Sequence, residues 1–422
     1  MNLLKISWAN IAHKPLNSLL ILLLLSFGVG LISLMIVLNV SLQSQFEKNV
    51  KDIDLVLGAK GSSLQLLLSA VYQVDAPTGN ISLQDFENFK RDRKTRIFIK
   101  EAIPMSYGDS YEKFRIVGTT HAYAEHYGAV PEIGALWKAP ILDSLDRVVT
   151  DNFSFNVHGL RVDTIEATIG SKVALETGMS VGDTFFSFHG LDNASEAHYN
   201  IVFKIVGVFG ETRSVVDQLI LSSLESIWAV HPPKEGDGPK KREITAALIK
   251  VTNAIGVLSL NGSDQIKKGN MILAAPAIEI NRLTQQFGIG MSVLSAIGIL
   301  IAIISFISVF ISLFNSLKDR KYELALIRTM GGGRSKVFML ILQEGLILSF
   351  LGFIIGLALS RIGLLVMSAA LADEFHYTLS DLGIVKFEYW MFAITIFVGC
   401  LASLLPAFKA VRIDISKTLA DG

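Results

Sequence analysis

The stretch KYELALIRTMGGGRSK, which runs from Lys321 to Lys336, carries charges at both ends and three consecutive glycines. Long apolar stretches flank it on both sides. Residues 322–330 can form about two and a half turns of helix, and the glycines at 331–333 would end that helix. Such a segment can be a nucleotide-binding loop, an ordinary connector between membrane helices, or a docking surface for another protein.

The rest of the chain indicates that the apolar flanks are membrane helices. The chain has 422 residues and is 51% hydrophobic and 18% charged, whereas soluble domains carry about 25% charged residues. A membrane-spanning helix needs about 20 consecutive apolar residues. Four transmembrane helices are predicted, and they lie between Lys14 and Glu47, between Arg282 and Lys318, from Val337 to Ser360, and between Glu388 and Lys409.

The first apolar stretch is longer than the core of a signal peptide, which spans roughly 7–15 residues. We therefore expect a retained anchor, preceded by a short amphipathic helix within residues 1–14 and entered at Pro15. Lysine and arginine residues favour the cytoplasmic side of a membrane. They gather before the first stretch, between the second and third, and after the fourth, which predicts cytoplasmic termini. Arg361 is expected to snorkel at the outer surface.

The segment between the first two apolar stretches has a mixed α/β texture. RIFIKEAIPM (96–105) and YNIVFKIVGVF (199–209) indicate strands, and SKVALETGMSVGDTFFSF (171–188) indicates a short helix, a turn at Gly178 and a strand. The predicted fold class is an α-helical membrane protein with four transmembrane helices and a large extracytoplasmic α/β domain inserted between helices 1 and 2. The predicted domains are residues 1–45, with the first transmembrane helix, residues 46–284, the outer domain, and residues 285–422, with the last three transmembrane helices.

No motif for nucleotide or nucleophile chemistry is present. The pattern G-x-x-x-x-G-K-[ST], in which backbone amides and a lysine hold phosphates, does not occur. GGGRSK has the wrong spacing, and LVLGAKGSSLQLLL (55–68) places its lysine before the glycine. Cys400 is the only cysteine and lies in the fourth apolar stretch. We predict no catalytic residue, no cofactor and no metal, and the zero net charge gives no sign of nucleic-acid binding.

The histidines carry no recognisable metal motif. The chain has eight, and H-E-x-x-H does not occur. His121 and His126 are five residues apart, which does not place them on one helix face. We expect solvated or singly bonded histidines, and metal binding stays an open question for the six in the outer segment, which are His121, His126, His158, His189, His198 and His231.

The third apolar stretch contains two features that need a neighbour. Glu344 lies about two turns into it, where a carboxylate must face protein or water. It can be a coupling contact at the helix base or a hydrogen-bonded packing residue. Gly352, Gly356 and Ser360 recur every four residues, which permits close packing against a helix of this chain or of a second copy.

In the connector, Leu324, Ile327 and Met330 share one predicted helix face. The charged side chains of the same helix lie largely elsewhere. An amphipathic helix of this kind can seat its apolar face in a groove of a partner or rest on lipid. Both interpretations remain open from the residues alone.

The sequence DRKYELALIRTMGGGRSKVFMLILQEGLILSFLGFIIG (319–356) resembles the FtsX-like permease domain. LPAFKAVRIDISKTL (405–419) resembles the family's C-terminal ending, although Ile415 or Ser416 stands where the family usually has proline. IGSKVALETGMSVGDTFF (169–186) and FKIVGVF (203–209) resemble the MacB-like periplasmic core domain. The residues that match the permease pattern are Arg320, Glu323, Arg328, Gly331 and Glu344.

The resemblance implies a non-enzymatic permease subunit of an ABC system of the MacB, LolC or FtsX type in a bacterial inner membrane. It implies a dimer of identical or related permease chains, a cytoplasmic ATPase that binds the ATP, contact with membrane lipid, and a periplasmic adaptor or outer-membrane lipoprotein as a further partner. The connector would then be the helix that docks on the ATPase. The coupling residues would be Arg320, Lys321, Tyr322, Glu323, Leu324, Leu326, Ile327, Arg328, Met330, Gly331 and Glu344.

Three functions remain open at this point. The first is a transport subunit whose outer domains move on a lipoprotein, a peptide or another amphiphile. The second is an FtsX-like subunit that activates a cell-wall hydrolase or another outer partner. The third is a membrane-anchored outer enzyme or metal-binding protein.

Overall fold

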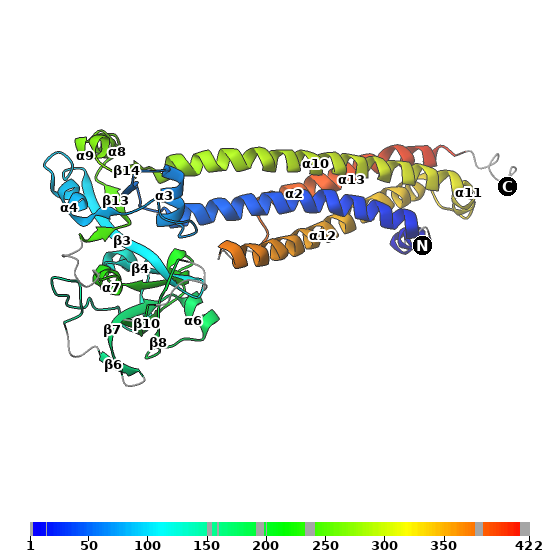
Figure 1. Ribbon diagram of the computed structural model, residues 1–422. Coiled ribbons are helices and arrows are strands. Elements are labelled where there is room, and N and C mark those ends of the chain that lie inside the picture. Colours follow the sequence, from blue (N-terminus) through cyan, green and yellow to red (C-terminus); the bar gives the residue numbers. More distant parts are fainter. Residues whose placement is uncertain are drawn as a thin grey trace. The chain divides into compact units, whose positions relative to one another are not determined.

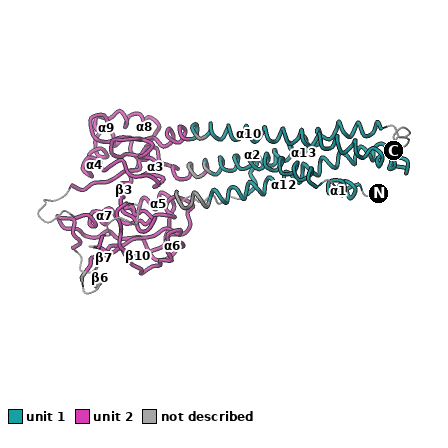
Figure 2. Tube along the Cα trace, turned by 45° about the vertical axis from the view of Figure 1, so that its right-hand side comes forward, with its two compact units in different colours: residues 1–43, 284–422 teal, residues 44–283 magenta. Residues whose placement is uncertain are grey.

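The computed structural model describes residues 3–13, 15–149, 154–157, 160–190, 198–199, 201–232, 241–375 and 383–413. The chain divides into two compact units (Figure 2). We call Met1–Gln43 with Thr284–Gly422 the helical unit, and Ser44–Leu283 the α/β unit. Residues 376–382, between the third and fourth predicted transmembrane helices, and the part of the C-terminal motif beyond residue 413 lie outside the described residues.

Long apolar helices make up the helical unit (Figure 1). Among the described residues, four helices are long and apolar enough to cross a membrane by length and composition: α2, α10, α12 and α13. They coincide with the four predicted stretches but extend beyond them, and α13 includes both Glu388 and Lys409. The helices are α1 (Leu3–His13), α2 (Pro15–Asn49), α10 (Pro276–Asp319), α11 (Lys321–Thr329), α12 (Arg334–Phe375) and α13 (Lys386–Val411).

The small residues of α12 lie against α2 of the same chain. A Cβ atom added to Gly352 would come within 2.4 Å of the Leu25 side chain, and one added to Gly356 within 2.8 Å of Val29. Larger side chains at these positions would push the two backbones apart. Of the two interpretations of this stripe, these contacts favour packing within one chain.

A polar cluster joins α2, α12 and α13 inside the helical unit. Glu388 is 1% exposed, and its carboxylate accepts hydrogen bonds from the Ser33 hydroxyl (2.5 Å) and from Arg361 (2.7 Å). The hydroxyl oxygens of Ser33 and Ser360 lie 2.9 Å apart, within hydrogen-bond distance. The sequence had predicted that Arg361 snorkels at the outer surface. Its guanidinium instead pairs with Glu388, because a buried carboxylate requires a charged partner.

The α/β unit is built on one twelve-stranded sheet with the main order β14-β1-β13-β3-β4-β11-β7-β10-β5 (Figure 1). Strands β6, β8 and β9 pair with β7, β10 and β3, and β2 forms a small separate sheet with β12. The strands are β1 (Leu55–Ala59), β2 (Ile81–Ser82), β3 (Ile99–Tyr111), β4 (Phe114–Thr119), β5 (Pro131–Gly134), β6 (Ser154–Val157), β7 (Leu160–Ile169), β8 (Thr184–Phe185), β9 (Phe188–His189), β10 (Ile201–Phe209), β11 (Leu219–Ser222), β12 (Glu243–Ile244), β13 (Ala246–Val251) and β14 (Met271–Ala274).

Two hydrophobic cores hold this sheet. One surrounds Phe86 and Phe89 of α4 together with β1, β13 and β14, and the other surrounds Phe114 and Phe203 with α6 and α7. The expected α/β texture is therefore present. The helices are α3 (Ser63–Ala70), α4 (Leu83–Arg91), α5 (His121–His126), α6 (Ser171–Thr177), the 3-10 helix η2 (Val215–Gln218), α7 (Leu224–Val230), α8 (Ala254–Asn261) and α9 (Asp264–Lys268).

Local sequence signals set several element ends. α6 ends at Gly178, whose φ of +72° is the left-handed conformation that glycine adopts without strain. The predicted helix and turn over 171–178 are present, and in place of the single predicted strand the chain forms the two short strands β8 and β9. Pro15 opens α2, where its missing N–H leaves no hydrogen bond unmade.

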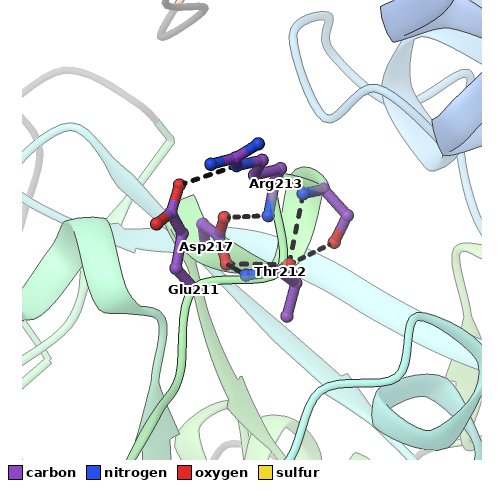
Figure 3. Close-up of polar contacts among 5 residues, drawn as sticks. Glu211, Thr212, Arg213 and Asp217 are labelled. Atoms are coloured by element: carbon purple, nitrogen blue, oxygen red, sulfur yellow. Dashed lines mark hydrogen bonds and ion pairs between the residues drawn. The ribbon is translucent and has the colours of Figure 1, made fainter.

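One buried carboxylate organises the turn between β10 and η2 (Figure 3). Asp217 is 9% exposed. One of its oxygens accepts from the Thr212 backbone N–H (2.8 Å) and hydroxyl (2.7 Å), and the other accepts from the Arg213 backbone N–H (2.6 Å). Arg213 has φ +57°, which is uncommon for a residue other than glycine, and its guanidinium lies 3.2 Å from Glu211. The carboxylate of Asp217 thus stabilises a strained turn.

Candidate functional site

The connector helix α11 lies between α10 and α12 and ends at the glycine run. Gly332 N–H donates to the Ile327 carbonyl (2.8 Å) and Gly331 N–H to the Arg328 carbonyl (3.2 Å). Gly331 has φ +93°. These two bonds and the left-handed glycine form a Schellman ending, which explains why the sequence needs glycine at 331.

The apolar residues of α11 do not form the single face that the spacing predicted. Leu324 (2% exposed) packs in a cluster within its own unit, and Ile327 lies at the edge of that cluster. Met330, by contrast, is 86% exposed. Leu324 therefore faces its own chain and does not form one exposed face with Met330, as the spacing had predicted. The cluster comprises Leu317, Leu324, Val337, Leu340, Ile341, Ala407 and Ala410.

A second, exposed stripe runs along α11. Tyr322, Leu326 and Met330 are 47%, 40% and 86% exposed, and their four-residue spacing places them on one side of the helix. Lys321 and Glu323 beside them are also exposed. The side of α11 that is open to a partner is thus apolar in its centre and charged at its beginning.

A polar network fixes the start of α11 to the base of α12. Glu344, 3% exposed, accepts hydrogen bonds from Arg320 (3.1 Å) and from the Asn10 amide (2.5 Å). Arg320 also pairs with Glu323 at 3.1 Å. Glu344 is therefore a hydrogen-bonded packing residue, and the same contact connects α12 to the connector.

The end of α11 is held by a different contact. Arg328 donates to the backbone carbonyl of Ile413 at 2.8 Å, just beyond α13. Its guanidinium therefore stabilises the position of α11 against the C-terminal end of the last long helix. Together with Arg320 and Leu324, it holds α11 against its own unit, while the side chains of Tyr322, Leu326 and Met330 stay exposed among the described residues.

Several of the contacting residues carried no signal in the sequence. Asn10 and Ser7 of α1 reach α12, where Ser7 donates to the Leu340 carbonyl at 3.2 Å. The Arg361–Glu388 pair was also missed. A lone acid at the start of an apolar helix and a lone arginine in another are the signal that could have suggested the second pair, since buried charges need partners.

These features define a membrane-helix unit with an amphipathic connector held at both ends, joined in one chain to an α/β unit. Residues 295–415 match the family model described as FtsX-like permease C-terminal. The match confirms the predicted resemblance of the C-terminal region to the FtsX-like permease domain.

The chain is similar to one solved structure, the extracellular domain of the noncanonic ABC-type transporter YknZ from Gram-positive bacteria. It is 13% identical, and the match covers 49% of this chain and 88% of that chain with a TM-score of 0.26. At this TM-score the likeness is no argument for a shared fold. No curated protein matches the chain.

Proposed function

We propose that this chain is the transmembrane subunit of an ABC transporter of the MacB or LolC type. It would bind no ATP and catalyse no reaction itself, since no nucleotide motif occurs in its sequence. A cytoplasmic ATPase would bind and hydrolyse the ATP, and two permease chains would form a dimer in the inner membrane of a bacterium with cytoplasmic termini. The FtsX-like match over residues 295–415 supports the ABC permease assignment.

The exposed stripe of α11 is the observation that carries the proposal. Tyr322, Leu326 and Met330 offer an apolar surface, and Lys321 and Glu323 add charges that can fix the register of a partner. Exposed aromatic and methionine side chains are typical of protein interfaces. We assign this side of α11, and no longer the face of Leu324, as the surface that docks on the ATPase.

The seating of α11 gives a physical path for coupling. A displacement of the docked helix would be transmitted to α12 through the contact between Arg320 and Glu344. It would be transmitted to the end of α13 through the hydrogen bond from Arg328 to the Ile413 carbonyl. These contacts are directional hydrogen bonds to charged groups, which resist displacement more than apolar contacts do. The long helices would carry this motion to the outer domains, which act on a periplasmic lipoprotein, peptide or other amphiphile.

A co-purification experiment tests the docking surface. The double variant Leu326→Glu/Met330→Glu should reduce the ATPase recovered with the intact chain at least tenfold, because charge replaces the apolar centre of the stripe. Leu175→Glu is the matched control, since Leu175 is 84% exposed on α6 of the α/β unit and is remote in sequence from the connector. Membrane insertion of all variants is measured in parallel by carbonate extraction.

Full recovery of the ATPase with the stripe variant would contradict the docking role and favour a helix that rests on lipid. Recovery of no ATPase even with the unaltered chain would contradict the transporter assignment itself. In that case the membrane-anchored alternative becomes the better description.

A further inference from the structure

Four side chains from separate segments of the α/β unit converge on one point. Asp109 in β3 and His189 in β9 are direct partners in the antiparallel register, so their side chains lie on the same face of the sheet. His231 is the residue at which α7 ends. His198 is held nearby by its backbone N–H, which donates to the Ser187 carbonyl at 2.9 Å.

The three imidazole rings surround a single carboxylate oxygen. The distances to Asp109 Oδ1 are 3.3 Å from His189 Nδ1, 3.5 Å from His231 Nε2 and 3.7 Å from His198 Nε2. The ligand atoms of the four residues all lie within 4.8 Å of one another. The centroids of the three rings are 4.1–5.0 Å apart.

The cluster is incomplete as a hydrogen-bond network. Asp109 is 2% exposed, yet neither of its oxygens has a hydrogen-bond partner among the described residues. The same holds for Nε2 of His198. A buried carboxylate without partners is strongly unfavourable, and buried polar atoms left open in a native fold call for an ion or a water.

One ring is already oriented for metal binding. His231 Nδ1 lies 3.2 Å from the Ile227 carbonyl oxygen. A carbonyl only accepts, so Nδ1 carries the proton and Nε2 presents its lone pair toward Asp109. A backbone carbonyl on the second nitrogen is the usual way in which proteins fix the tautomer of a metal-binding histidine.

We propose that Asp109, His189, His198 and His231 bind a divalent transition-metal ion, with Zn²⁺ as the preferred ion. Metal–ligand bonds of about 2.0–2.1 Å place the corners of a tetrahedron roughly 3.4 Å apart, and the nitrogen–oxygen distances of 3.3–3.7 Å agree with that value. Three imidazoles and one carboxylate suit zinc and exclude a soft thiolate site. The ion would compensate the buried charge of Asp109. This inference does not rest on the transporter assignment.

The site has an open side. The His189 side chain is 50% exposed, whereas that of Asp109 is 1% exposed. An ion can therefore enter past His189 and exchange with the surroundings. Once bound, it would tie β3, β9, the segment at His198 and the end of α7 together, and so stiffen this part of the unit.

Zinc titration of the intact chain tests the proposal. The full-length protein in detergent is stripped with a chelator, and Zn²⁺ alone is added in competition with a zinc-sensitive dye. We expect one equivalent of tightly bound zinc, and a loss of affinity of roughly 100-fold or more in Asp109→Asn and His231→Ala, since removing even outer-shell partners costs 10–100-fold. His121→Gln is the matched control, because His121 is exposed and lies outside the cluster.

A second variant and a second metal distinguish the loss of a metal ligand from a loss of zinc caused by misfolding. His189→Ala removes a half-exposed side chain, so it should fold and still lose the zinc. Co²⁺ should give the strong visible absorption of a tetrahedral site in the unaltered chain and not in His189→Ala. Absence of stoichiometric zinc in the unaltered chain, equal affinity in all variants, or an equal loss in His121→Gln would each overturn the proposal.

Discussion

Two buried aspartates of the α/β unit stand in opposite situations. Asp217 is 9% exposed, and each of its oxygens accepts a hydrogen bond from the turn that it organises (Figure 3). Asp109 is 2% exposed and, among the described residues, has three imidazoles around it and no hydrogen bond. Hydrogen-bond donors of its own turn surround the first carboxylate, whereas the second faces the three histidines of the proposed zinc site.

The buried carboxylates of the helical unit resemble Asp217, because each of them accepts hydrogen bonds from donors in its own unit. Glu388 is bonded to Ser33 and Arg361, and Glu344 to Asn10 and Arg320. These buried acids have cationic and neutral donors in place, as the low dielectric of their surroundings requires. A buried carboxylate with donors in place fixes structure, and our proposal is that the one facing three imidazole nitrogens binds a cation.

The largest effect is expected at Glu388. Replacing it with leucine removes the carboxylate partner of the largely buried Arg361 guanidinium, and breaking a buried pair costs about 3–5 kcal/mol. The thermal unfolding midpoint of the intact chain in detergent measures this loss. In the double variant Arg361→Met/Glu388→Leu most of the stability should return, because no charge remains unpaired. A single variant as stable as the unaltered chain would mean that this acid is not structurally required.

The two aspartates themselves give the sharpest contrast. In metal-free buffer, Asp217→Asn should reduce stability by about 1–3 kcal/mol, because buried donors of the turn lose their acceptor. Asp109→Asn should leave stability unchanged or raise it, since it removes an uncompensated buried charge. Thermal unfolding with a chelator present compares them. An equal loss in both variants would show that the unmetallated Asp109 is already satisfied.

Adding zinc should make the unaltered chain more stable than the Asp109→Asn variant. At a free zinc concentration of 100 times the dissociation constant, binding stabilises the unaltered chain by about 2.7 kcal/mol. The Asp109→Asn variant should gain almost nothing, whereas Asp217→Asn should gain as much as the unaltered chain.

The smallest effect is expected at the base of the connector. Asn10→Ala removes one hydrogen bond from Glu344 but leaves Arg320 in place, so the expected loss is about 1 kcal/mol. Glu323→Gln is the control, because the Arg320–Glu323 pair is exposed on the glutamate side and such pairs contribute about 0–1 kcal/mol. A loss at Asn10 as large as that at Glu388 would mean that Arg320 does not compensate Glu344.

Features governed by neighbouring residues in the sequence were predictable. Length and apolar composition located α2, α10, α12 and α13, and the glycine at 178 marked the end of α6. The end of α11 at Gly331 followed from the same rule. These signals are local, so they do not depend on how the chain packs.

Features that depend on tertiary packing were not predictable. The spacing of Leu324, Ile327 and Met330 could not show which of them faces α12, because that depends on how α12 and α13 lie against the connector. Asp109 meets His189 through the register of β9 on β3, and it meets His231 through the position of α7. No spacing between such distant residues encodes a metal site, which is why no motif appeared.

Anomalous X-ray diffraction from crystals of the zinc-loaded intact chain, recorded on both sides of the zinc absorption edge, is the most direct test of the contrast between the two aspartates. The account predicts one anomalous peak, bonded to Asp109 and to the rings of His189, His198 and His231, and none at Asp217. No peak at Asp109, or zinc bound only at other surface residues, would contradict it.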